Sequence, residues 1–533
     1  MLDCIIKNGN IVDGTGKPSF ISDIGIQEGK IAKVGSLQDA DAARVIDAKG
    51  YIVTPGFIDG HSHSDLIVGI DSEATNILGQ GITTEVTGNC GWSLAPYSEE
   101  NFNMFGLMFP SSMRDKLMQL KSMSNTFGTW MEGLGSLKMG TNMACYVGHS
   151  ALRLAAMGTA NRIPTDEEMD KMKELLRESL EAGAFGFTTG LIYPPGAYAR
   201  EEEITELCKV VAEYDRIYTT HMRNESHSII PAIEETLRIV QKSGVRSIIS
   251  HHKVMSISQA GLSERTLEML DNANLMGLRV ATDQYPYRAG ATRLTSALPP
   301  RHASEGVAKL IEKLKDEQFR AQITEELKDE NTGFENLIAN SGGFDGVLVG
   351  FARNTPQYNG RFISDIAVER NMDAFETFYD IIIENEGNAM GAFFITNEDD
   401  IERIFKHPRN MIGTDAAHAT FFNLFGHPRS SGTFARVMSH YVRDRKLVTL
   451  EEGIRKATSL PAETIGIANK GIINEGYDAD ILVIDYENLA DKADYVNPNA
   501  KNVGYKYVLV NGQIALAEDA CTGILAGKAL RKK

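Results

Sequence analysis

Two histidines separated by one residue, His61 and His63, follow the short apolar run Phe57-Ile58. In an extended strand alternate side chains point to the same face, so both imidazoles can reach one metal ion. Three further residues with metal-ligand chemistry follow apolar or β-branched runs later in the chain, and these are His221, His251 and Asp415. Ligands at the ends of several strands predict one shared metal site.

Cys90 adds a thiolate candidate in the glycine-flanked loop 88–91, after the strand-like residues 82–86. Zinc accepts imidazole, thiolate and carboxylate ligands, and a catalytic zinc site keeps one position open for water. Water on such a metal has a pKa near ~7, and a carboxylate such as Asp415 can take its proton and later return it. The pattern is typical of a hydrolase. The alternatives for Cys90 are a buried packing residue and a papain-type nucleophile, which would lack a base nearby in the sequence.

Helix-like and strand-like segments alternate through most of the chain, and the candidate ligands follow the strand-like ones. Thr165 and Glu168 form a capping-box pattern ahead of apolar residues at helical spacing, and Gly183 ends that run before the strand-like residues 184–187. Repeated units of this kind predict an α/β fold, a TIM-type (β/α)8 barrel at residues 57–467. Its active site is expected at the carboxyl ends of the strands.

The two ends of the chain have a different pattern, with short alternating strands at residues 1–56 and 468–533. Turns are expected at Asn8-Gly9, around Glu28-Gly29 and at an NG pair near residue 511. We expect the two segments to form one small β-sandwich domain. Residues 296–346 break the alternation of the barrel, and we expect them to form an inserted subdomain that covers the site as a lid.

The composition excludes several classes of protein. A net charge of -17, with no dense Lys/Arg block except residues 531–533, argues against nucleic acid as a partner. No apolar run reaches the roughly 18 residues of a membrane span, and the first residues lack a signal-peptide pattern. Five widely spaced cysteines are typical of a reducing compartment. We expect a cytoplasmic enzyme with a small-molecule substrate. Whether it forms a homo-oligomer is not decided by the sequence.

Several separated motifs resemble the N-acyl-D-amino-acid deacylases, the D-aminoacylase branch of the amidohydrolase superfamily. They are residues 55–65 (PGFIDGHSHSD), 88–91 (GNCG), 186–196 (GFTTGLIYPPG), 250–253 (SHHK), 285–287 (YPY) and 427–434 (HPRSSGTF). The resemblance extends from end to end of the chain. It implies zinc-dependent hydrolysis of the amide bond of N-acyl-D-amino acids to a carboxylate and a free D-amino acid.

The resemblance also implies a role for each candidate residue. It implies zinc held tightly by Cys90, His221 and His251, and a second, weaker divalent metal at His61, His63 and Asp415, with Cys90 as a bridge. Asp415 is then the general acid and base, and Tyr193 helps to polarise the scissile carbonyl. Lys253, Tyr285 and Arg429 would hold the substrate carboxylate.

The substrate side chain and acyl group stay open at this point. Residues 416–425 form an apolar loop where the family commonly has glycine after the aspartate, and Phe421, Phe422 and Phe425 either line an apolar pocket or simply pack. Arg288 and Arg293 would instead favour an acidic side chain. The alternative substrates are a cyclic amide, as in hydantoinases, and a D-configured dipeptide. A non-catalytic scaffold is the remaining alternative, although every expected metal position is filled.

Overall fold

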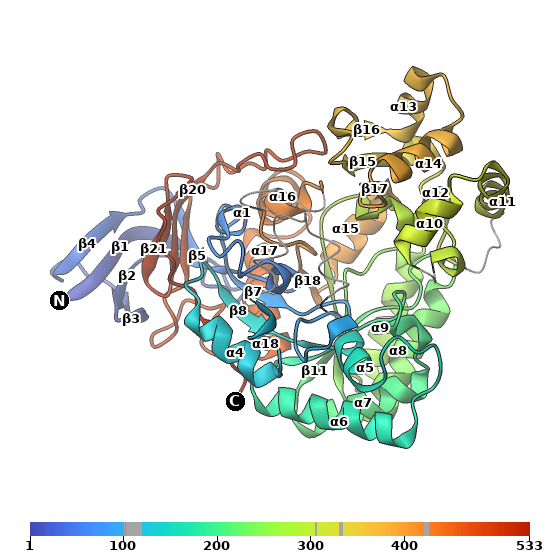
Figure 1. Ribbon diagram of the computed structural model, residues 1–533. Helices are drawn as coiled ribbons and strands as arrows, with labels where there is room; N and C mark the ends of the chain where they lie inside the picture. Colours follow the sequence, from blue (N-terminus) through green and yellow to red (C-terminus); the bar gives the residue numbers. More distant parts are fainter. Residues whose placement is uncertain (101, 103–119, 304–305, 330–333, 420–425) are drawn as a thin grey trace.

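The computed structural model describes residues 1–533 except 101, 103–119, 304–305, 330–333 and 420–425, and its centre is a barrel of parallel strands (Figure 1). Two groups of paired strands, β6-β7-β8 and β9-β10-β11-β12-β13-β18, are continuous because only Tyr146 separates β8 from β9. The barrel strands are β6 (Phe57–Asp59), β7 (Ile82–Thr87), β8 (Asn142–Cys145), β9 (Val147–Gly148), β10 (Gly186–Gly190), β11 (Ile217–His221), β12 (Arg246–Ile249), β13 (Val280–Gln284) and β18 (Asn410–Ile412). All residues of β7, β10, β11 and β13 are buried, as in parallel sheets covered on both faces. The predicted (β/α)8 barrel is confirmed.

The barrel closes between its first and last strands, β6 and β18. Just beyond these strands, the Asp415 N–H donates to the His61 carbonyl at 2.8 Å. The His63 N–H donates to the Ala416 carbonyl at 2.7 Å. The closure therefore places Asp415 beside His61 and His63, although 352 positions separate His63 from Asp415 in the chain.

Amphipathic helices cover the outside of the barrel. Helix α6 (Asp166–Glu181) begins with the predicted capping box, because the Thr165 hydroxyl accepts from the Glu168 N–H and the Glu168 carboxylate accepts from the Thr165 N–H. Its Met172, Leu176 and Leu180 are buried in the core that the helices share with the strands. The other α-helices described outside the inserted subdomain are α1 (Thr75–Leu78), α4 (Phe127–Ser136), α5 (His149–Met157), α7 (Glu201–Glu213), α8 (Ile229–Ser243), α9 (Ser263–Leu275), α15 (Glu398–Lys406), α16 (Arg429–Arg436), α17 (Leu450–Ala457) and α18 (Ser459–Ile465).

Both ends of the chain contribute to one bent sheet beside the barrel, and this is the predicted β-sandwich (Figure 1). Its strands are β1 (Leu2–Ile11), β2 (Phe20–Gln27), β3 (Lys30–Gly35), β4 (Ala42–Asp47), β5 (Ile52–Pro55), β19 (Ile481–Ile484), β20 (Tyr505–Val510), β21 (Gln513–Ala517) and β22 (Ala520–Cys521). The hairpins predicted around Glu28-Gly29 and Asn511-Gly512 are present. The sheet bends until its two halves meet, where the Ala479 N–H donates to the Gly29 carbonyl at 2.9 Å. Apolar side chains from both ends of the chain fill the enclosed core.

Two details of the terminal segments differ from the prediction. The expected turn at Asn8-Gly9 is wrong, because β1 continues through these residues as one strand with a bulge. Asn8 has a φ of 60°, and Gly9 is required because a Cβ there would lie 2.5 Å from Val53. Residues 468–533 also do not all belong to the sandwich, because β23 (Ala529–Leu530) pairs with the barrel strand β8.

An inserted subdomain separates the barrel strands β13 and β18. Its sheet has the order β14-β17-β15-β16 and it has its own apolar core. The elements are β14 (Ala289–Arg293), β15 (Val347–Phe351), β16 (Arg361–Phe362), β17 (Met390–Phe394), α10 (Val307–Lys313), α11 (Glu317–Lys328), α12 (Leu337–Asn340), α13 (Ile363–Arg370) and α14 (Ala374–Glu384). The expected limits of 296–346 are too narrow, because β14 and β17 pair along their length and enclose residues 289–394. A lid function for this subdomain stays a prediction.

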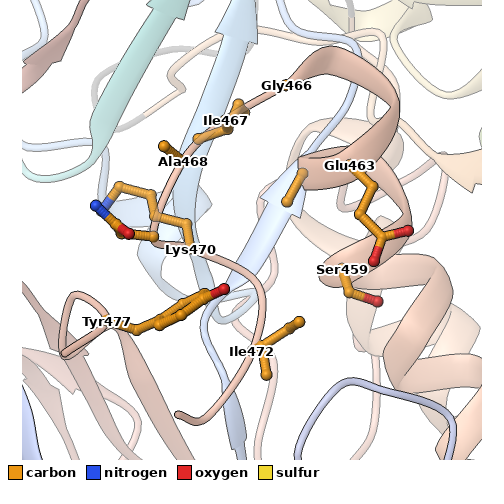
Figure 2. A pocket seen from close by; sticks show the side chains of 10 residues that line it. Ser459, Glu463, Gly466, Ile467, Ala468, Lys470, Ile472 and Tyr477 are labelled. Carbon is orange, nitrogen blue, oxygen red and sulfur yellow. The ribbon is translucent and has the colours of Figure 1, made fainter. Parts of the chain in front are cut away.

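A hollow of about 390 Å³ lies where α18 and residues 466–477 meet the sandwich (Figure 2). The charged group of Lys470 in its wall is compensated, because its Nζ lies 2.6 Å from Asp480 and 3.0 Å from Asp478. None of the candidate metal ligands lines the hollow. We therefore regard it as part of the junction between barrel and sandwich.

Among the described residues, none of the helices has the length and apolar character needed to span a membrane. All five cysteines are free thiols, and Cys90 is among the four that are buried. Disulfide bonds therefore do not contribute to this fold.

Candidate metal centre

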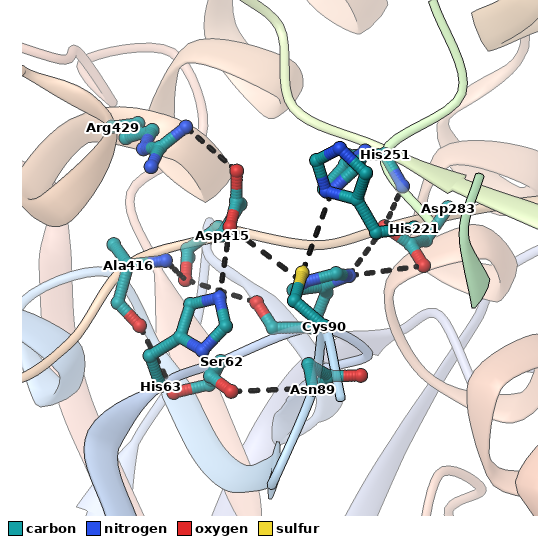
Figure 3. A network of polar contacts seen from close by, with 12 residues as sticks. Ser62, His63, Asn89, Cys90, His221, His251, Asp283, Asp415, Ala416 and Arg429 are labelled. Carbon is teal, nitrogen blue, oxygen red and sulfur yellow. Dashed lines mark hydrogen bonds and ion pairs between the residues drawn. The ribbon is translucent and has the colours of Figure 1, made fainter. Parts of the chain in front are cut away.

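The structure brings the six predicted ligands together at the carboxyl ends of the barrel strands. Two overlapping groups result, and within each group the ligand atoms lie within 4.8 Å of one another. The first group is His61, His63, Cys90 and Asp415, and the second is Cys90, His221 and His251. Figure 3 shows Cys90 between the two groups, with Asp415 and His63 on one side and His221 and His251 on the other.

Unusual backbone conformations turn several of these ligands toward the same space. Cys90, His251 and Asp415 have φ values of 54°, 35° and 49°, a left-handed region that residues with side chains rarely adopt. Such conformations cost of order 1–3 kcal/mol each and persist only where the surrounding structure holds them in place. Close packing adds a second constraint, since a Cβ at Gly190 would lie 2.2 Å from the Cys90 carbonyl oxygen.

The sulfur of Cys90 is surrounded by imidazoles. It lies 3.4 Å from His61 Nε2 and 3.6 Å from His251 Nε2. Burial raises the pKa of the Cys90 thiol, but the charge of His61 and the hydrogen bonds with His61 and His251 outweigh burial and hold this pKa well below its usual value. This environment therefore favours the thiolate form of Cys90, which is the form that binds metals.

His221 has the environment of a metal ligand. Both of its ring nitrogens are buried, and neither has a hydrogen-bond partner within the part of the chain that the structure describes. Burial lowers the pKa of this imidazole, so it stays neutral and able to coordinate. Buried polar atoms are nearly always hydrogen-bonded, so two such nitrogens beside a thiolate fit a site that holds a cation.

Carboxylates behind the histidines fix their orientation. Asp283 lies 3.2 Å from His61 Nδ1 and also accepts from the His251 N–H at 2.7 Å. Glu225 lies 3.0 Å from His251 Nδ1. With the Nδ1 atoms held by carboxylates, the Nε2 atoms of His61 and His251 face Cys90, as is usual for metal-binding histidines.

Asp415 and Arg429 form a buried ion pair at the edge of the site. Arg429 donates from one guanidinium nitrogen to Asp415 Oδ2 at 2.7 Å, while Asp415 Oδ1 lies 3.1 Å from His63 Nε2. Burial raises the pKa of Asp415, but Arg429 and the neighbouring histidines hold it well below its usual value. Asp415 is therefore an ionised carboxylate that faces the ligand group through one oxygen.

The other residues predicted to bind substrate lie close to Arg429 or to the ligand histidines. The Tyr285 ring has Arg429 over it at 5.0 Å and Lys253 at 5.7 Å. Lys253 Nζ forms an ion pair of 2.7 Å with Glu225. The ring of Tyr193 contacts that of His221, with the centroids 4.9 Å apart. The structure thus gathers all four residues around the two ligand groups, and their roles toward substrate stay proposals.

The structure describes two of the five residues proposed to select the substrate side chain. Phe421, Phe422 and Phe425 lie outside the described residues. Arg288 is exposed and donates to the Thr396 carbonyl at 3.3 Å. Arg293 is half-buried on β14, and burial lowers its pKa. An acidic side chain as the preferred substrate therefore stays a prediction.

Glu85 on β7 is an essential neighbour that the sequence analysis missed. Its buried carboxylate accepts from Ser62 Oγ at 2.9 Å, from Ser64 Oγ at 2.5 Å and from Thr141 Oγ1 at 2.6 Å. It also forms an ion pair of 2.8 Å with His418. The serines alternate with His61 and His63, so the segment after β6 that turns its histidines toward the metal site turns its hydroxyls toward Glu85. This alternation is the signal that the sequence contained.

Comparisons with known proteins assign the family. A family model described as "Amidohydrolase family" matches residues 44–516. This chain belongs to that family. A D-aminoacylase of Alcaligenes xylosoxydans xylosoxydans is 35% identical over 99% of this chain and 98% of its own length. An N-acyl-D-aspartate deacylase of the same organism is 32% identical over 96% of this chain and 91% of its own length.

A solved structure is similar over the whole length of this amidohydrolase. It is the N-acyl-D-glutamate deacylase from Bordetella bronchiseptica, in complex with zinc and a phosphonate inhibitor that mimics the tetrahedral intermediate of the reaction. It is 33% identical, it covers 99% of both chains and its TM-score is 0.81. The family resemblance inferred from the sequence motifs is confirmed. The chain is a hydrolase of the D-aminoacylase branch rather than a non-catalytic scaffold.

Replacement of Glu85 by alanine is expected to destabilise the amidohydrolase strongly. The change leaves the buried His418 and three buried hydroxyls without their acceptor, and removing one partner of a buried ion pair costs about 3 kcal/mol or more. The midpoint of urea unfolding should fall accordingly. The matched control is Glu132→Ala on α4, whose side chain is exposed and whose midpoint should not change. Equal midpoints for the two variants would contradict a stabilising role for Glu85.

Proposed function

We propose that this amidohydrolase cleaves the amide bond of N-acyl-D-amino acids, releasing a carboxylate and a free D-amino acid. The observation that carries the proposal is the Cys90 thiolate shared by two ligand groups, next to the ionised Asp415 and its partner Arg429. A hydrolytic centre and a cationic group for a carboxylate thus lie side by side. The activities named for the similar proteins, a D-aminoacylase and deacylases of N-acyl-D-aspartate and N-acyl-D-glutamate, support this choice of substrate.

The donor set fits zinc, and we propose zinc as the metal. Cys90, His221 and His251 supply one thiolate and two imidazoles, which is a ligand set that zinc prefers. His61, His63 and Asp415 would hold a second divalent ion, with Cys90 shared. When bound, zinc would act as a Lewis acid toward the scissile carbonyl and lower the pKa of the attacking water.

Asp415 and Tyr193 would handle the proton and the charge of the reaction. The Asp415 carboxylate accepts a proton from water as the oxygen adds to the carbonyl carbon. It then returns the proton to the amide nitrogen as the C–N bond breaks, so that the amine leaves neutral. The Tyr193 hydroxyl donates to the carbonyl oxygen while negative charge develops on it. Burial raises the pKa of Tyr193 well above its usual value, so the hydroxyl keeps its proton for this role.

Lys253, Tyr285 and Arg429 would fix the α-carboxylate of the substrate. A guanidinium and an ammonium that both lie over one tyrosine ring can hold a carboxylate in one orientation. Once the carboxylate and the scissile carbonyl are both fixed, the configuration at the α-carbon decides whether the amide reaches the reacting groups. Such a site would select one configuration, and the activities named for the similar proteins favour the D-form.

The proposal is tested by screening the zinc-loaded protein against N-acetyl- and N-formyl-D-amino acids. Hydrolysis of the D-forms is expected, with the L-forms and the α-carboxamides as controls that react far more slowly. A cyclic amide such as a hydantoin and a D-configured dipeptide belong in the same screen. Hydrolysis of either of these without hydrolysis of the N-acyl-D-amino acids would replace the proposed substrate by that alternative.

Asp415→Asn is expected to lower kcat by about 100-fold or more, because the amide cannot accept and return the proton. Zinc at Cys90, His221 and His251 should be retained, since Asp415 belongs to the other ligand group. The measurements are steady-state kinetics and the zinc content after gel filtration. A variant with an unchanged kcat would refute the assignment of Asp415 as the acid and base.

Zinc uptake is expected to release protons and to strengthen as the pH rises toward about 9. Burial and the charge of Lys253 lower the pKa of the zinc ligand His251, but the charge of Glu225 and a hydrogen bond with Cys90 raise it to about 9 in the metal-free protein. Protons therefore compete with the metal below that pH, and raising the pH removes the competitor. Calorimetric titration with zinc at pH 7, in buffers of different ionisation enthalpy, counts the released protons. A count of zero would contradict the prediction.

A further inference from the structure

The buried carboxylate of Glu335 joins the inserted subdomain to a loop behind the candidate metal ligands. This side chain is 8% exposed, and its Oε1 accepts from the backbone N–H of Glu225 and from that of Ser226, the latter at 3.1 Å. The next residue, Asn336, caps α12 and donates to the Leu327 carbonyl at 2.7 Å. Glu335 is therefore fixed within the subdomain while it binds a loop of the barrel.

That loop carries Glu225, whose carboxylate contacts three groups of the site. Its oxygens lie 3.0 Å from His251 Nδ1, 2.7 Å from Lys253 Nζ and 3.7 Å from His221 Nε2. Burial raises the pKa of Glu225, but Lys253 and the two histidines outweigh burial and hold this pKa low. One carboxylate thus orients a candidate zinc ligand and the ammonium proposed to bind substrate.

A second contact joins the inserted subdomain to the loops that follow His221 and His251. Met255, which follows Lys253 in the chain, packs in the core of the inserted subdomain. The Met255 N–H donates to the Glu225 carbonyl at 2.7 Å, so the loops after His221 and His251 are tied to each other. The subdomain also packs closely against Ile257 in the loop after His251, because a Cβ added at Gly342 would lie 2.6 Å from the Ile257 side chain.

We infer that Glu335 is a positioning residue: it holds the backbone of Glu225 so that Glu225 keeps His251 and Lys253 in place. The subdomain then sets both the affinity for zinc and the selectivity for a substrate carboxylate, although it supplies no ligand among the six described above. The second part of this inference rests on the proposed function, because it depends on Lys253 binding the α-carboxylate of the substrate.

Three variants of Glu335 and one control separate positioning from a structural role. Glu335→Ala removes the acceptor for both N–H groups, while Glu335→Gln keeps a carbonyl oxygen in its place. Glu335→Asp keeps the charge but shortens the side chain by one methylene. The matched control is Glu325→Ala on α11, an exposed residue that pairs with Lys328 at 3.0 Å.

The expected result for Glu335→Ala is a zinc affinity about tenfold weaker, since loss of a partner behind a ligand typically costs 10–100-fold. Its KM for an N-acetyl-D-amino acid should rise about tenfold, while its KM for the corresponding carboxamide changes little. Glu335→Gln and Glu325→Ala should stay within about twofold of the parent protein in both quantities, and Glu335→Asp should be intermediate. Zinc affinity is measured by competition with a chelator, and folding by circular dichroism and thermal melting.

A Glu335→Ala protein with lower thermal stability, but with unchanged zinc affinity and an unchanged ratio of the two KM values, would overturn the inference. If this variant does not fold, Glu335→Asp decides, because parent-like behaviour of the shortened side chain would also overturn it. The zinc competition involves no substrate. It therefore decides on Glu335 even if the parent protein does not hydrolyse N-acyl-D-amino acids, which would refute the proposed function alone.

Discussion

The approach of the Cys90 sulfur to His61 on one side and His251 on the other is the contact on which the site depends. Several imidazoles in a buried space repel one another when protonated, and a single thiolate between them reduces that cost. The two sides come from different strands of the barrel. The ligands of one side follow β6 and β18, which meet where the barrel closes, and those of the other side lie at the ends of β11 and β12. Since Cys90 belongs to both ligand groups, a shift of its loop would disturb both.

Around this contact, carboxylates that take no direct part in ligation hold the ligands in place. Asp283 and Glu225 are aligned with the Nδ1 atoms of His61 and His251, and Glu85 holds the hydroxyls that alternate with the first two histidines. Each carboxylate is buried and each has several donors, so its charge is compensated. The hydrogen-bond network therefore extends one layer outward from the ligands, and at Glu335 it crosses into the inserted subdomain.

The sequence predicted the barrel, the sandwich and the set of candidate ligands, because each ligand follows a strand-like segment and strand ends share one rim. It did not predict the carboxylates behind the ligands. Glu85 lies inside a buried strand whose threonine-rich sequence resembles an exposed one, and Glu225 and Glu335 lie in irregular segments with no periodicity. The limits of the inserted subdomain were also missed, since pairing between β14 and β17 depends on contacts distant in sequence. The prediction of a turn at Asn8-Gly9 was wrong because an Asn-Gly pair also fits a β-bulge.

The place of the inserted subdomain between β13 and β18 has a consequence for folding. Until β18 joins β6, the barrel is an open sheet with two unpaired edges, and such edges are sites of aggregation in a nascent chain. The entropy lost on closing a loop grows with its length, but a segment that folds into a compact body with its own core brings its ends together beforehand. Antiparallel pairing of β14 with β17 does this at the base of the insertion. Early folding of this segment therefore shortens the time for which the nascent sheet remains open.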